Sequence, residues 1–73
     1  MEALVIKAEF DDEARVWIAN DDTLGLVAEA DTIEVLEYKL QELIPELAEL
    51  NGNDLPRPIR FTLVSERTLS AFA

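Results

Sequence analysis

The chain has 73 residues, of which 49% are hydrophobic, and its formal net charge is -10. A chain of this length forms one domain at most, and because it contains neither cysteine nor histidine, no disulfide and no zinc site built from those residues can support the fold. Its acidic surface repels phosphate backbones, so we expect no direct contact with nucleic acid.

The same charge attracts basic proteins, although it is also explained by the need to keep the protein dispersed in solution. The apolar runs are too short to cross a bilayer, and the first residues lack the pattern of a secretory signal. We therefore expect a cytoplasmic protein without a membrane partner. A homodimer is expected because small domains without covalent staples often rely on oligomerisation.

The first two apolar runs predict a β-hairpin. In "ALVIKAEF" every second residue is apolar, which is typical of a strand with one buried face; these residues are Leu4, Ile6, Ala8 and Phe10. The polar turn "DDEA" separates this run from a second strand, "RVWIAN". If even-numbered residues of both strands face the core, Phe10 pairs with Ala14 or Val16, and Trp17 lies on the outer face. The opposite parity, which buries Trp17, is the alternative.

A third strand and a helix start follow. "DDTLG" is a second polar turn, closed by Gly25, and "LVAEA" is a short strand. Asp31 is the predicted N-cap of the helix, and Glu34, three residues later, completes a capping box.

Seven apolar residues at helical spacing predict one amphipathic helix; they are Ile33, Leu36, Leu40, Leu43, Ile44, Leu47 and Leu50. Pro45 removes one backbone hydrogen bond within this run. A break after Ile44 is the alternative, but Leu47 and Leu50 continue the stripe, so we expect one helix bent at Pro45. Gly52 is expected to supply the left-handed residue that ends the helix.

"IRFTLVSE" predicts a fourth strand, with Ile59, Phe61 and Leu63 facing inward. The order β-β-β-α-β indicates an α+β fold. In it, one helix packs on one face of a four-stranded mixed sheet of order 3-2-1-4, because a right-handed crossover brings the fourth strand beside the first. We expect residues 1–66 to form a single domain and residues 67–73 to form a short tail.

The second face of this sheet is expected to be bare and to bind a partner or a second copy. A tryptophan among apolar neighbours on an uncovered face is typical of an interface. Strand parity assigns eight residues to this surface: Val5, Lys7, Glu9, Arg15, Trp17, Arg60, Thr62 and Val64. All of them except Glu9 are predicted to bind the partner or the second copy.

No set of residues indicates a reaction. The acidic pairs at 11–13 and 21–22 could hold Mg²⁺, but each is a typical turn signal, and the second strand separates them by about 20 Å. Without histidine, cysteine or a glycine-rich phosphate loop, we predict no catalytic, cofactor-binding or metal-binding residue. We therefore expect a non-enzymatic protein-binding module. The alternatives are a small-molecule-binding accessory domain and, last, a metal-dependent nuclease.

Residues 5–44 resemble the N-terminal domain of HicB-like antitoxins, and most closely the small uncharacterised bacterial relatives of that family. The resemblance rests on an acidic turn after the first strand, an aromatic second strand, an acid-x-x-Gly-Leu loop and an Asp-Thr-x-Glu helix start; here these are Asp11, Asp12, Trp17, Asp22 to Leu26, Asp31, Thr32 and Glu34. It implies a β-β-β-α-β fold with a partial ribonuclease-H-like sheet. It also implies a non-enzymatic module that masks a small basic ribonuclease toxin and usually dimerises.

Two features depart from the pattern of that family. Leu24, Gly25 and Leu26 stand where the family usually has Pro-Gly and Cys. Pro45 within the helix is closer to the uncharacterised relatives than to proven antitoxins.

Overall fold

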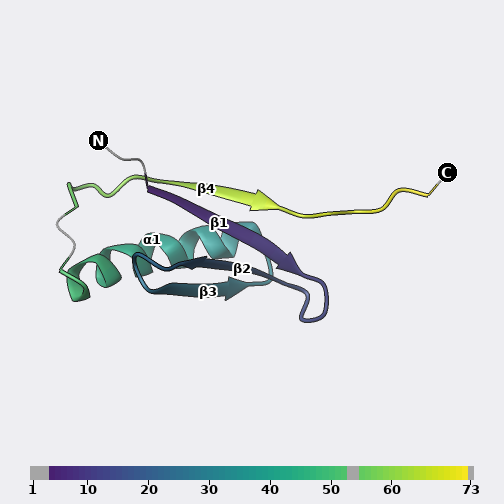
Figure 1. Ribbon diagram of the computed structural model, residues 1–73, viewed down its shortest axis with the longest axis horizontal. Coiled ribbons are helices and arrows are strands. Elements are labelled where there is room, and N and C mark those ends of the chain that lie inside the picture. Colours follow the sequence, from purple (N-terminus) through teal and green to yellow (C-terminus); the bar gives the residue numbers. More distant parts are fainter. Residues whose placement is uncertain (1–3, 53–54, 73) are drawn as a thin grey trace.

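The computed structural model describes residues 4–52 and 55–72. Its elements are β1 (Leu4–Asp11), β2 (Val16–Asp21), β3 (Leu26–Ala30), α1 (Ile33–Leu50) and β4 (Phe61–Glu66). The first three strands form an antiparallel meander, and β4 lies parallel to β1, which gives the strand order β3-β2-β1-β4 (Figure 1). The predicted α+β fold with strand order 3-2-1-4 is confirmed.

Helix α1 packs one stripe of side chains onto the sheet. Its contacts are mainly with β3 and then with β2. Burial of such apolar surface is the dominant favourable contribution to folding. The fully buried helix residues are Leu36, Leu40, Ile44 and Ala48. They meet a strand surface rich in alanine, made by Ile6, Ala8, Ala19, Leu26, Ala28 and Ala30, with Leu24 from the adjoining turn.

Helix α1 runs from Ile33 to Leu50 without a break, so the single helix predicted through Pro45 is confirmed. The buried residues recur every four positions, and the stripe therefore drifts around the helix axis. Leu50 falls at its margin and is 82% exposed, so its assignment to the buried stripe was wrong.

The helix starts one residue later than expected. Thr32 is the N-cap, and its Oγ1 accepts a hydrogen bond of 3.2 Å from the backbone N–H of Val35. The prediction of Asp31 as the cap, with Glu34 closing a capping box, was therefore wrong, since Val35 occupies the third helical position. Glu34 still lies in the first turn, where a negative charge favours the helix dipole.

The end of the helix matches the prediction and is fixed to the sheet. Gly52 has a φ of +69°, and its N–H donates to the carbonyl of Glu49 at 3.3 Å. Beside it, the Asn51 side chain donates from Nδ2 to the carbonyl of Leu24 at 2.8 Å. This bond joins the C-terminus of α1 to the turn between β2 and β3.

The register of the first hairpin differs from the expected one. Asp11 pairs with Val16 and Phe10 pairs with Trp17, so the connection is the four-residue loop 12–15. Asp11 Oδ1 accepts the N–H groups of Glu13 and Ala14, and Arg15 adopts a φ of +60°, which closes a loop of this length. An even loop length reverses the parity of β2, because a shift of one residue moves every side chain to the other face.

The cap assignment predicts different effects for two neighbouring substitutions. Thr32→Ala removes the oxygen that accepts from the Val35 amide, and it should lower the free energy of unfolding by about 1 kcal/mol. Asp31→Ala is the matched control and should cost clearly less in buffer of high ionic strength, where dipole effects are screened. Urea unfolding followed by circular dichroism measures both; a larger loss for Asp31→Ala would contradict the assignment.

Candidate binding surface

Residues along each strand alternate between the two faces of the sheet, and the face opposite α1 carries the more exposed set. It is built from odd-numbered positions of β1 and from even-numbered positions of β2 and β4, as the strand register shows. Val5 is 45% exposed here although it is apolar, and it lies beside Thr62 of β4. We call this surface the open face.

Four residues of the open face form one row across all strands. Glu9 lies between Glu66 of β4 and Ile18 of β2, and Ile18 in turn pairs with Glu29 of β3. The three glutamates are exposed, whereas Ile18 is half-buried. Like charges on neighbouring strands are destabilising, so the pair Glu9 and Glu66 lowers the stability of the free protein. We call Glu66, Glu9, Ile18 and Glu29 the acidic row.

A shallow groove follows the acidic row on β1 and β2. Its volume is about 420 Å³, and it is lined by Lys7, Glu9, Phe10, Asp11, Ile18 and Asn20. The neighbouring row of the open face is nearly uncharged: Lys7 lies between Val64 and Asn20, and Asn20 pairs with Val27. The open face thus offers apolar and acidic groups side by side.

The structure gathers five of the predicted surface residues on the open face: Val5, Lys7, Glu9, Thr62 and Val64. Arg15 lies instead in the hairpin loop, where its guanidinium is 3.8 Å from the Asp12 carboxylate and 5.1 Å from the centre of the Phe10 ring. Arg60 precedes β4 and is exposed, and it lines a second groove to which Gln41 of α1 also contributes. The role of these residues in partner binding stays a prediction.

Trp17 lies on the side of the sheet that faces α1, so its assignment to the open face was wrong. Its ring contacts Phe10 edge-to-face with a centroid distance of 5.3 Å, and it packs half-buried against the core. The reversed parity of β2 is the cause. It also explains why Ile18 was absent from the predicted surface, whereas Glu29 of β3 and Glu66 of β4 were not assigned to either face.

One signal in the sequence could have identified this parity. The strand positions below the helix are small: Ala8 on β1 and Ala28 and Ala30 on β3 are all buried. Ala19 of β2 matches this pattern and is fully buried, with Ala8 of β1 and Ala28 of β3 as its partners on the adjacent strands. If the alanines are taken as the helix-facing set, Trp17 moves to the covered side.

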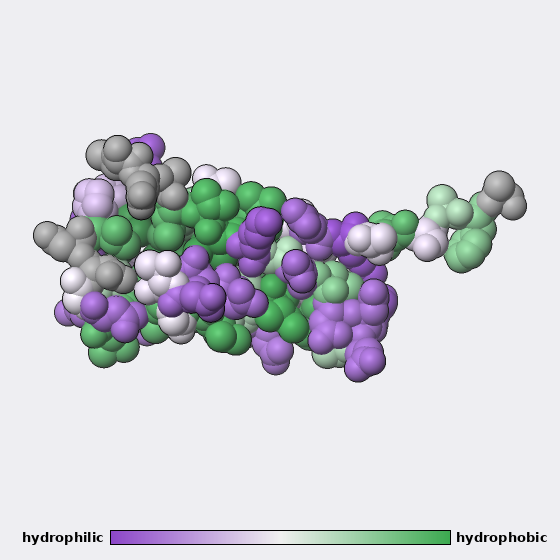
Figure 2. Space-filling model, viewed as in Figure 1, coloured by the Kyte–Doolittle hydropathy of each residue, from purple (hydrophilic) through white to green (hydrophobic). Residues whose placement is uncertain are grey.

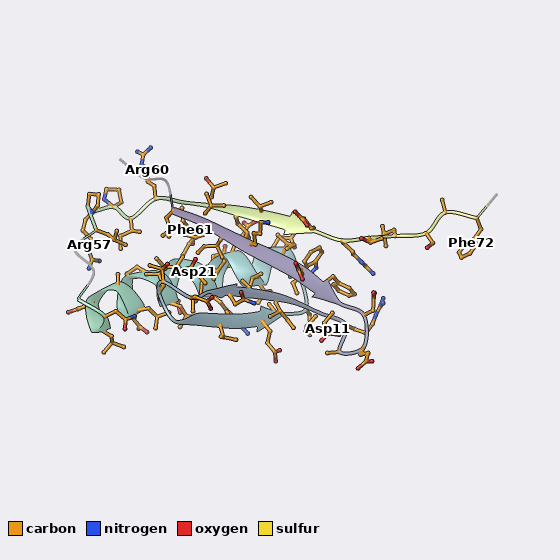
Figure 3. All side chains as sticks on the ribbon, viewed as in Figure 1. Asp11, Asp21, Arg57, Arg60, Phe61 and Phe72 are labelled. Atoms are coloured by element: carbon orange, nitrogen blue, oxygen red, sulfur yellow. The ribbon has the colours of Figure 1, made fainter. Side chains whose placement is uncertain are left out.

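The acidic residues at 11–13 and 21–22 lie at turns, where Asp11 and Asp21 accept backbone hydrogen bonds. Asp11 and Asp21 lie at opposite ends of β2 (Figure 3). Asp21 Oδ2 accepts the Leu24 N–H at 3.0 Å, just as Asp11 accepts two N–H groups of its own loop. Within residues 4–52 and 55–72, no three acidic side chains are grouped so as to hold a metal ion.

Comparison with known proteins places the chain in a family. Residues 3–72 match the family described as a domain of unknown function, DUF1902. The chain belongs to this family. The crystal structure of a hypothetical protein from the extremely thermophilic bacterium Thermus thermophilus is similar to this DUF1902 chain, with a TM-score of 0.81 and 41% sequence identity, over 96% of this chain and 100% of that chain. No curated protein matches the sequence.

Neither the family description nor the Thermus protein states an activity or a partner. The function of this DUF1902 chain therefore has to be inferred from the chemistry of its surface. In the part of the chain that the structure describes, no helix is both long and apolar enough to cross a membrane.

Trp17 is the only tryptophan and reports the covered side of the sheet. Because its ring packs on Phe10 and the core, its fluorescence emission should shift to longer wavelength when the protein unfolds in urea. A ligand on the open face should leave the native emission maximum unchanged. An emission maximum that does not move on unfolding would show that the ring is already in water and would contradict this placement.

Proposed function

We propose that this DUF1902 protein is a non-enzymatic module whose open face binds a small basic protein. The acidic row is the observation that carries the proposal. Glu9 and Glu66 lie on adjacent strands without a basic side chain between them in the row, and Ile18 provides an apolar contact beside them. A lysine or arginine of a partner would neutralise this repulsion.

The charge of the whole chain supports the same partner. A net charge of -10 attracts a basic protein from a distance and raises the rate of association. Val5 and Val27 are exposed apolar residues on the same face, 45% and 76% accessible. Apolar side chains within a polar surround are the usual composition of a protein interface.

The resemblance to HicB-like antitoxins suggests the kind of basic protein. A small ribonuclease toxin must be basic to bind RNA, because RNA contributes dense negative charge. An acidic sheet face competes with RNA for the same lysines and arginines. We therefore propose that the module masks such a ribonuclease, and that both act in the cytoplasm, where the RNA substrates are.

The groove of about 420 Å³ favours a second candidate function, the binding of a small molecule. Lys7 and Asn20 supply hydrogen-bond donors there, and Asp11 supplies an acceptor. A small polar ligand in this groove should bind with little dependence on ionic strength, whereas a basic protein should be released by salt.

Capture from an extract of the native host tests the first proposal. The immobilised chain should retain a small basic protein at low ionic strength, and salt should release it. The purified partner should degrade RNA, and addition of the chain should inhibit it. If no protein is retained at low salt, or if the retained protein does not depend on salt, the proposal loses its support.

Two variants of equal charge identify the binding face. Glu9→Gln, Glu29→Gln and Glu66→Gln together remove three charges from the acidic row. As the matched control, Glu34→Gln, Glu42→Gln and Glu49→Gln remove three exposed charges from α1. The first variant should weaken binding of the partner at least about tenfold, which corresponds to about 1.4 kcal/mol. Equal weakening by both variants would show that net charge alone attracts the partner.

A further inference from the structure

The two edges of the sheet differ in their protection. At β3, Lys39 of α1 donates from Nζ to the carbonyl of Glu29 at 2.6 Å, and the helix packs closely on this strand. At β4, no strand among the described residues pairs with the outer edge. The β4 sequence "FTLVSE" contains neither lysine nor proline, which natural sheets use to block an edge.

The chain after β4 continues away from the body of the protein (Figure 1). Residues 67–72 give the molecule its long dimension, 50 Å against 24 and 20 Å. Leu69 is 73% exposed and Phe72 is 94% exposed, and Figure 2 shows hydrophobic residues along this projecting segment. Arg67 holds its start, with the guanidinium carbon 3.8 Å from the centre of the Phe10 ring.

A second groove runs beside β4 on the side that faces α1. Its volume is about 570 Å³, and it is lined by Glu37, Gln41, Ile59, Arg60, Phe61 and Leu63. It exists because the helix packs mainly on β3 and β2. Phe61 and Leu63 point toward the helix side and remain half-buried, so apolar surface lies directly beside the unprotected edge.

We propose that a second copy of this chain occupies this edge, with β4 and residues 67–72 of the two copies pairing antiparallel. The two sheets then join into one across a twofold axis perpendicular to the sheet. With this symmetry, opposed residues keep the same face, so odd-numbered residues meet odd-numbered ones. Leu69 of the second copy then lies on the helix side, over Phe61 and Leu63, and closes the groove.

The charge of the projecting segment favours a second copy over an unrelated partner. Residues 67–72 carry one charge, that of Arg67, in a chain of net charge -10. This segment can therefore approach another copy without the repulsion that the acidic faces exert on each other. Each copy supplies both a free β4 edge and the segment 67–72 that covers the edge of the other copy. A twofold dimer requires this self-complementarity.

Most of the open face stays accessible in this dimer, because the new contact uses the edge and the helix side. Glu66, at the end of β4, is the one member of the acidic row that also lies on the pairing strand. The inference is therefore independent of the proposed partner on the acidic row. Either one can fail while the other holds.

Sedimentation velocity of three proteins tests the proposal. The unaltered chain should be a dimer that dissociates on dilution. Leu69→Glu with Phe72→Glu should raise the dissociation constant of the dimer at least about tenfold. The control, Val27→Glu with Leu50→Glu, replaces two other exposed apolar residues and adds the same charge, yet it should leave the dimer intact.

Three outcomes would overturn the proposal. The unaltered chain could be monomeric at all concentrations. The control could dissociate the dimer while the tail variant does not, which would move the contact to the open face or the helix end. The tail variant could dimerise as well as the unaltered chain. Circular dichroism of each variant confirms that it is folded, because all four sites are exposed and none contributes to the core.

A mixed sample of isotope-labelled and unlabelled chains identifies the contact itself. Nuclear Overhauser effects between copies should connect the Leu69 methyl groups to the Phe61 ring or to the Leu63 methyl groups. Effects that instead connect Val5 or Val27 to the second copy would place the dimer on the open face and contradict the edge pairing.

Discussion

Helix α1 packs through Leu36, Leu40, Ile44 and Ala48 onto strands whose covered positions are mostly alanine. Small strand residues let the helix approach the sheet closely, but only over β3 and β2. One helix is about 10–12 Å wide with its side chains, whereas strands are spaced about 4.8 Å apart, so it cannot cover four strands. The position of this contact therefore determines which surfaces the rest of the chain leaves exposed.

Two surfaces remain, and they differ in chemistry. The reverse side of the sheet carries three glutamates around Ile18, a pattern suited to a basic protein. The β4 edge instead adjoins apolar side chains and continues into a segment with a single positive charge. These surfaces share only Glu66 of β4, so a twofold dimer through the edge would present two acidic rows on one continuous sheet. Such a dimer would bind two copies of a partner.

Much of the fold could be predicted from the sequence, because alternation and helical spacing are local signals. The strand order, the continuous helix through Pro45 and the left-handed Gly52 are examples. The residues of the open face were harder to predict, since they depend on the pairing register of the strands. The length of the loop after Asp11 decides whether Trp17 or Ile18 faces the core, since one residue more or less reverses the parity of β2. Strand and turn propensities hardly distinguish the two loop lengths. The same holds for the cap, where Asp31 and Thr32 are both good N-cap residues.

Substitution of two neighbouring residues tests most directly whether only one side of the sheet is covered. Ile6 and Val5 are adjacent on β1 but face opposite sides, with exposures of 1% and 45%. Ile6→Thr should lower the free energy of unfolding by about 2 to 4 kcal/mol, because it leaves a cavity and a buried hydroxyl. Val5→Thr keeps the shape and should change the free energy of unfolding by less than about 0.5 kcal/mol, measured by urea unfolding of the monomer. Equal losses at both positions would contradict the account, since they would show that the reverse side is also packed.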